Sequence, residues 1–248
     1  MTGYDALIPP EVSQDSFHSF IEAQARRKDV QTILEIGSSS GEGSTSAFVS
    51  GMKLNPNRPI LYCIELSKIR FDALKKRYEA NDQVRCYNVS TVSADNFPSE
   101  AEVALFYRRF ATNLNRYPLH EVLKWRRQDL DYLRTCGLPT DGIGLIKREN
   151  GINQFDLVLI DGSAFTGPTE LDQVYGAGII LLDDVNDIKN MESYRRLLSD
   201  PHYALITENW KIRNGYAAFG RRDTQRSWLL RSFPFLSRVR LPGNPAKS

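Results

Sequence analysis

Short hydrophobic runs recur along this 248-residue chain, and they predict the strands of one sheet. The runs cover residues 33–36, 60–65, 84–89, 155–160, 178–182, 203–207 and 215–219. Runs of this length that end in turn-forming residues are typical of buried strands. The segments between them carry hydrophobic residues at helical spacing, as Phe71, Leu74 and Tyr78 do. This alternation of strands and helices predicts an α/β protein.

A glycine-rich loop follows the first run, where the chain reads Glu35-Ile36-Gly37-Ser38-Ser39-Ser40-Gly41-Glu42-Gly43. Glycines let the backbone turn sharply and approach a ligand, and a strand, a glycine loop and a helix together build nucleotide sites in α/β proteins. A dinucleotide fingerprint needs glycine at the first, third and sixth positions. Counted from Gly37, the third and sixth positions are Ser39 and Glu42. The spacing therefore argues against an NAD-linked oxidoreductase, which is the weaker alternative.

The order of the motifs resembles that of the class I S-adenosylmethionine (SAM)-dependent methyltransferases. The glycine loop has an acid, Glu35, two residues before its first glycine, and the second run ends in Glu65. The runs at 155–160 and 178–182 are each followed by acidic residues, and the likeness extends over about residues 30–222. It implies a Rossmann-like, doubly wound, seven-stranded sheet whose last strand is antiparallel, with a helical insert after strand three. It also implies SAM as the cofactor.

The same resemblance assigns residues to the cofactor site. Glu65 would hold the ribose hydroxyl groups, and Ser90 or Thr91 would lie near the adenine, although a serine there is also an ordinary start of a loop. The complete set that the resemblance implies for SAM is Glu35, Gly37, Ser38, Ser39, Gly41, Ser44, Glu65, Ser90 and Asp161. A non-catalytic module that binds SAM or a partner stays an alternative.

Three acidic residues follow two of the runs, Asp161 after the fourth and Asp183 with Asp184 after the fifth. Because carboxyl ends of parallel strands meet at one edge of a sheet, we expect these carboxylates to converge. Clustered carboxylates repel unless they are protonated or neutralised, for example by a hard divalent cation. The motif at 160–163 and the Asp-Asp pair resemble the metal-dependent O-methyltransferases of the macrocin type. That resemblance implies Mg²⁺ on all three aspartates and Asp161 as a candidate base; Ser163 departs from the pattern, and acids that cap turns are the alternative.

Residues 98–150 exceed a minimal methyltransferase and predict a cap beside the site. They combine aromatic and basic residues, among them Phe106, Tyr107, Arg108, Arg109, Arg116, Tyr117, Trp125, Arg126 and Arg127. Insertions next to the carboxyl ends of strands lie where ligands enter an α/β fold. We expect the cap to contact the methyl acceptor; a cap with a solvated basic face is the alternative. The chain is otherwise one domain over 1–248, with a tail at 223–248 that could pack on the domain or form a homo-oligomer.

Composition excludes several classes of protein. A formal charge of +2 gives the whole chain no electrostatic reason to bind nucleic acid. Its three cysteines have neither metal-ligand spacing nor the pattern of a disulfide framework, which fits the cytoplasm. No hydrophobic run approaches the length of an integral membrane span, and no secretory signal is evident. The expected function is metal-assisted O-methylation of a small molecule, such as a sugar or a glycosylated metabolite.

Overall fold

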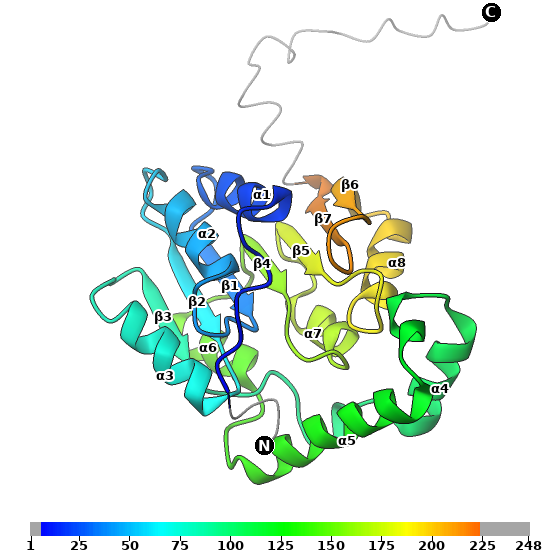
Figure 1. Cartoon of the computed structure of the whole chain (residues 1–248). Helices are drawn as coiled ribbons and strands as arrows, with labels where there is room; N and C mark the ends of the chain where they lie inside the picture. Colours follow the sequence, from blue (N-terminus) through cyan, green and yellow to red (C-terminus); the bar gives the residue numbers. More distant parts are fainter. Residues whose placement is uncertain (1–5, 224–248) are drawn as a thin grey trace, which may run out of the picture.

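A seven-stranded sheet organises the computed structural model, which describes residues 6–223 (Figure 1). Its strands are β1 (Thr32–Ile36), β2 (Ile60–Ile64), β3 (Val84–Tyr87), β4 (Leu157–Ile160), β5 (Ile179–Asp183), β6 (Tyr203–Asn209) and β7 (Tyr216–Arg221). All seven coincide with the hydrophobic runs, within a few residues at each end. The predicted tail lies almost wholly outside the described residues.

The strands are ordered β3-β2-β1-β4-β5-β7-β6. β1 pairs in parallel with β2 and with β4, whereas β7 is antiparallel to both β5 and β6. The predicted doubly wound sheet with an antiparallel last strand is therefore confirmed. β2 and β3 lie on one side of β1, whereas β4 and the later strands lie on the other side. The strand order therefore reverses between β1 and β4. Ligands of open α/β sheets bind outside the carboxyl ends of the strands at such a reversal.

Helices cover both faces of the sheet because neighbouring strand residues point to opposite sides. One layer consists of α1 (Ser16–Ala25), α2 (Ser44–Met52) and α3 (Lys68–Arg77), and its core contains Phe17, Phe48 and Leu74. The other layer consists of α6 (Gly142–Asn150), α7 (Gly167–Val174) and α8 (Met191–Ser199). Adjacent residues of β1 divide between them, since Ile33 packs in the first layer and Leu34 in the second.

The cap is smaller than the sequence predicts. It contains α4 (Glu100–Arg109), α5 (Leu119–Thr135) and two short 3₁₀ turns, Ala94–Asn96 and Asn113–Arg116. Figure 1 shows α4 and α5 extending beside the sheet. The predicted segment 98–150 also includes α6, but Ile143 and Ile146 of that helix are buried in the core of the sheet. The hydrophobic spacing of α6 makes it a layer of the main fold, so the cap ends before it.

The cap has a small core of its own. Val103, Phe106, Leu114 and Val122 from the cap pack with Phe165, which follows β4, and with Ile188, which follows β5. The cap therefore rests on the two loops that extend from the carboxyl ends of these strands. None of the helices within residues 6–223 is long and apolar enough to cross a membrane.

Candidate active site

A cavity of about 360 Å³ lies at the carboxyl ends of β1, β2, β3 and β4, where the strand order reverses. It is lined by residues 8–12, 36–40, 42–44, 64–66, 89–92 and 161–164, together with Arg70, Phe97, Asp129, Leu133, Thr166, Glu170 and Lys189. Both its size and its mixture of apolar walls and a few polar groups are typical of small-molecule sites.

The glycine loop approaches β4 too closely for a side chain. Gly37 has φ +86°, and a Cβ atom there would lie 2.1 Å from the carbonyl oxygen of Asp161. The N–H groups of Gly37 and Ser38 both donate to the carbonyl oxygen of Ile64, at 3.0 Å. These bonds hold the loop across the ends of β1 and β2. The buried hydroxyl oxygens of Ser38 and Ser39 have no hydrogen-bond partner within the described chain, which fits a polar ligand in the cavity.

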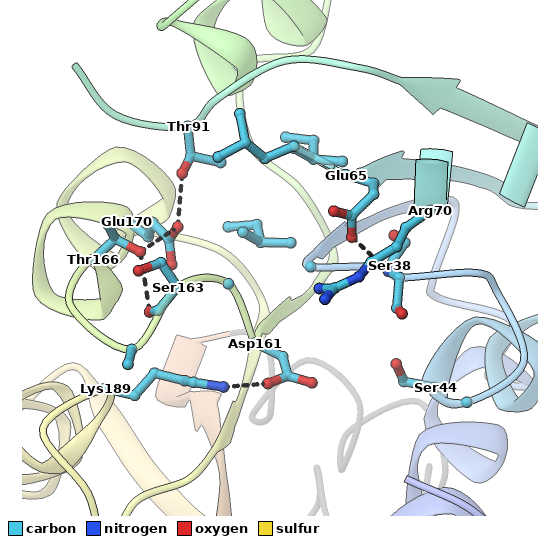
Figure 2. Close-up of a pocket in the computed structure, with 18 of the residues that line it drawn as sticks. Ser38, Ser44, Glu65, Arg70, Thr91, Asp161, Ser163, Thr166, Glu170 and Lys189 are labelled. Carbon is cyan, nitrogen blue, oxygen red and sulfur yellow. Dashed lines mark hydrogen bonds and ion pairs between the residues drawn. The ribbon is translucent and has the colours of Figure 1, made fainter. Parts of the chain in front are cut away.

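Glu65 directly follows β2 and is 5% exposed. Its Oε2 accepts a hydrogen bond from the N–H group of Ser39 at 2.8 Å, and its Oε1 accepts one from the N–H group of Ser67 at 2.7 Å. Burial raises the pKa of the Glu65 carboxyl group, and the bond from Ser67 opposes this rise. Each carboxylate oxygen retains a lone pair, so the side chain fits a pair of ribose hydroxyl groups. Figure 2 shows it directed into the cavity.

Most residues that the resemblance assigns to SAM line the cavity, namely Gly37, Ser38, Ser39, Ser44, Glu65, Ser90 and Asp161. Glu35 does not. Its carboxylate is fully buried and accepts hydrogen bonds from the hydroxyl groups of Ser44 and Thr45 at 2.6 and 2.7 Å, so it fastens β1 to the start of α2.

Gly41 does not line the cavity either. It has φ +80°, and a Cβ atom there would lie 2.7 Å from the ring of Tyr78 in the segment after α3. The Tyr78 hydroxyl group donates to the carbonyl oxygen of Gly41 at 2.6 Å. The requirement for glycine at this position therefore comes from helix packing. Glu35 and Gly41 therefore hold the glycine loop in place through contacts with α2 and Tyr78, and neither faces the cavity.

Asp161 faces the cavity beside a lysine that no sequence motif singles out. The Nζ atom of Lys189 lies 2.7 Å from Oδ1 of Asp161 and 2.6 Å from Oδ2 of Asp184 (Figure 2 shows the first pair). Burial alone would lower the pKa of the Lys189 ammonium group, but the charges of Asp161 and Asp184 raise it well above its ordinary value. Burial raises the pKa of Asp161 well above its usual range, and Lys189 offsets only part of that rise.

Asp183 points elsewhere. Its carboxylate is 1% exposed and pairs with Nη2 of Arg213 at 2.9 and 3.2 Å. Arg213 also pairs with Asp15, which precedes α1. Burial and the charge of Asp184 raise the pKa of Asp183 to about 6, even though Arg213 lowers it.

These contacts do not fit Mg²⁺ bound by the three aspartates. The ammonium nitrogen of Lys189 lies between Asp161 and Asp184, where a bridging ion would have to bind, and Asp183 is directed at Arg213. Within residues 6–223, no group of three or more His, Cys, Asp or Glu side chains is arranged to hold a metal ion. The expected convergence is present for Asp161 and Asp184. The positive charge that compensates these aspartates, however, comes from Lys189 and Arg213. The predicted set of three aspartate ligands for Mg²⁺ therefore does not fit the structure.

Comparisons with known proteins identify the fold. An O-methyltransferase from Bacillus cereus in complex with S-adenosylhomocysteine (SAH) is similar, with a TM-score of 0.55 and 17% identity over 86% of this chain and 84% of that one. The O-methyltransferase TomG from Streptomyces achromogenes, involved in tomaymycin synthesis and bound to SAM, has a TM-score of 0.53 and 13% identity over 86% and 83%. An SAH-bound methyltransferase from Podospora anserina has a TM-score of 0.51 and 15% identity over 86% and 81%.

The fold is that of the class I methyltransferases. No protein-family model and no curated protein matches the chain.

Glu170, in α7, is a second polar residue of the cavity, in addition to Lys189, that the sequence did not reveal. It is 1% exposed, and its Oε1 accepts hydrogen bonds from the hydroxyl groups of Thr91 and Thr166 at 2.7 and 2.9 Å (Figure 2). Its Oε2 is buried without a partner in the described chain. Burial raises the pKa of Glu170, and the bond from Thr91 opposes the rise. In the sequence it reads only as an acid in the first turn of a helix, which is common.

The segment before α1 also belongs to the site. Residues 8–12 line the cavity, and Val12 is 3% exposed. The carbonyl oxygen of Val12 lies 3.2 Å from the position that a Cβ atom of Gly43 would take. Figure 1 shows this segment passing from α1 along the sheet toward the cap. This segment forms part of the cavity wall because it packs against the glycine loop, a contact that hydrophobic periodicity cannot reveal.

The cap contributes different residues from those expected. Asp129 and Leu133 of α5 line the cavity, and the hydroxyl group of Ser163 donates to Oδ2 of Asp129 at 2.7 Å. None of the aromatic or basic residues predicted to bind the acceptor lines the cavity in the described chain. Phe106 is buried in the core of the cap, and Arg127 pairs with Glu100 on its surface.

Proposed function

We propose that this protein is a SAM-dependent methyltransferase. The observation that carries the proposal is the pairing of a glycine loop, pressed against the backbone of Asp161, with the buried acid Glu65 on the neighbouring strand. Together they offer a close backbone approach and two free acceptor positions at one side of the cavity. Similar structures that are described with SAM or SAH bound support the same cofactor.

We further propose that the acceptor is a hydroxyl group of a small molecule, such as a sugar or a glycosylated metabolite. The cavity is lined by the segment 8–12 and by Asp129 and Leu133 of α5 as well as by the strand ends, which favours a compact acceptor. Two of the similar proteins are described as O-methyltransferases, which agrees with this proposal. Polar groups on the cap side, among them Asp129 and Ser163, suit a hydroxyl-rich molecule.

SAM supplies a methyl group that its positively charged sulfur already activates. The chain must therefore position the acceptor and remove a proton from it. Asp161 faces the cavity, and only its Oδ1 is engaged by Lys189. Its Oδ2 is placed to accept the hydroxyl proton while the acceptor oxygen forms its bond to the methyl carbon and the sulfur–carbon bond breaks. The raised pKa of the buried carboxyl group favours this role.

Calorimetric titration with SAM, and separately with NAD, tests the cofactor. We expect saturable binding of SAM and none of NAD. Incubation with SAM and a panel of sugars, glycosides and phenols then tests the reaction, with the mass gain of one methyl group as the readout. Absence of SAM binding would overturn the proposal, whereas SAM binding without transfer to any hydroxyl would favour a non-catalytic module.

A further inference from the structure

Lys189 occupies a fixed position between the ends of β4 and β5. Its neighbour Asn190 is fully buried, and the Asn190 amide group donates to the carbonyl oxygens of Ile160 and Asp183, at 3.0 and 2.7 Å. A Cβ atom at Gly167 would lie 2.0 Å from the carbonyl oxygen of Lys189, so α7 begins directly against this backbone. The lysine is therefore held by the ends of both strands and by a helix.

The side chain is as confined as the backbone. The side chains of Lys189, Asp161 and Asp184 are 12%, 18% and 9% exposed, so both ion pairs are largely shielded from water. A buried pair of carboxylates destabilises a fold unless positive charge compensates it. Here one ammonium group bridges the two carboxylates, in the way that a divalent cation would bridge them.

The third carboxylate has a separate cation. Arg213 reaches Asp183 from the turn between β6 and β7, and it also pairs with Asp15. Each of the three aspartates that could ligate a metal ion therefore has a positive partner supplied by the chain.

We propose that Lys189 takes the place of a divalent cation at this edge of the sheet, so that the protein binds no metal ion there and needs none. The ammonium group has three N–H donors, and two of them are directed at Asp161 and Asp184. Lys189 lines the cavity, so its third donor is available to an oxygen atom of a bound acceptor. This part rests on the proposed function; the replacement of the metal does not.

Titration with Mn²⁺, followed by electron paramagnetic resonance, tests the replacement without any activity measurement. The wild-type chain should show no saturable site. Lys189→Ala leaves Asp161 and Asp184 unpaired around a vacated space, so we expect it to gain one site with affinity roughly tenfold or more above the wild type. Adding Asp161→Asn should abolish that gain. Lys147→Ala is the control, because Lys147 is a partly buried lysine that donates to the carbonyl oxygen of Gln173 and contacts neither aspartate.

Two results would overturn the proposal. One is a stoichiometric Mn²⁺ site in the wild-type chain that Asp161→Asn removes. The other is a folded Lys189→Ala variant, verified by circular dichroism, that gains no site. Should Lys189→Ala fail to fold, the wild-type chain and its Asp161→Asn variant decide the question alone. Full methyl transfer in excess chelator is also expected; failure of SAM binding would remove the proposed function but leave the Mn²⁺ result unaffected.

Discussion

A Cβ atom on Gly37 would lie 2.1 Å from the carbonyl oxygen of Asp161, which directly follows β4. The glycine loop after β1 and the chain after β4 thus touch backbone to backbone at the floor of the cavity. This contact leaves no room for a side chain at Gly37, and it fixes where the loop can present its N–H groups to a ligand.

Replacement of Gly37 by Ala should abolish SAM binding and lower the melting temperature. The backbone carbonyl cannot move away as a flexible side chain could, so the loop must shift. Gly151→Ala is the matched control: it has φ +63° but nothing within 4 Å of its added Cβ atom. It should lose only about 1–2 kcal/mol of stability, the cost of a left-handed conformation, and it should keep SAM binding. Equal losses in the two variants would show that the contact with Asp161 is unimportant.

Glu65→Ala should weaken SAM binding through loss of one or two charge-assisted hydrogen bonds, each contributing about 1.5–3 kcal/mol. Calorimetry measures the change. Glu65 also accepts a hydrogen bond from the N–H group of Ser39. Glu65→Gln is therefore needed to separate the loss of a contact with the ligand from a shift of the glycine loop. Asp82→Ala, which removes an exposed partner of Arg58, should leave affinity unchanged. Unaltered affinity in Glu65→Ala would remove this residue from the site.

Glu170→Gln should make the protein more stable at neutral pH. Burial raises the folded-state pKa of Glu170 above its unfolded value, so the stability that its protonated form contributes is complete below about pH 4.5. That stability is lost as the pH rises through the folded-state pKa. The loss amounts to about 1.4 kcal/mol for each pH unit that separates the folded-state pKa from the unfolded-state pKa.

Thermal denaturation from pH 4.5 to pH 8 measures this difference. The variant should melt at a higher temperature than the wild type at pH 8 and at a similar temperature at pH 4.5, because glutamine does not ionise. If the advantage were independent of pH, the effect would come from packing or hydrogen bonding and not from the buried charge.

Asp129→Ala should impair use of the acceptor and spare SAM. The change removes the hydrogen bond between α5 and Ser163, so the cap loses a fixed contact with the loop after β4. We expect a KM for the acceptor raised about fivefold or more, in line with a lost bond to a charged group, and an unchanged Kd for SAM. Arg127→Ala breaks an exposed ion pair within the same cap and should change neither. A parallel loss of SAM affinity in Asp129→Ala would make α5 a cofactor lid.

The sequence by itself determined the fold. Strands can be recognised locally, because a short hydrophobic run bounded by turn residues has few other stable structures. The order of those runs, with Glu65 after the second and Asp161 after the fourth, was enough to place the cavity at the carboxyl ends of the strands. Seven of the nine residues assigned to SAM line it because the glycine loop and the strand ends are local features of the chain.

Only the tertiary structure decided how the buried charges are compensated. Lys189 is 28 residues from Asp161 in sequence, and Arg213 is 30 from Asp183, so no spacing rule connects them. Sequence patterns identify three acids at strand ends and the need for positive charge, but an ammonium group, a guanidinium group and a metal ion satisfy that need equally well. Which one is present depends on how the loops after β5 and β6 fold back over the edge of the sheet. Sequence spacing did not reveal the role of Glu170 either, because its hydrogen-bond partner Thr91 is 79 residues away in the sequence.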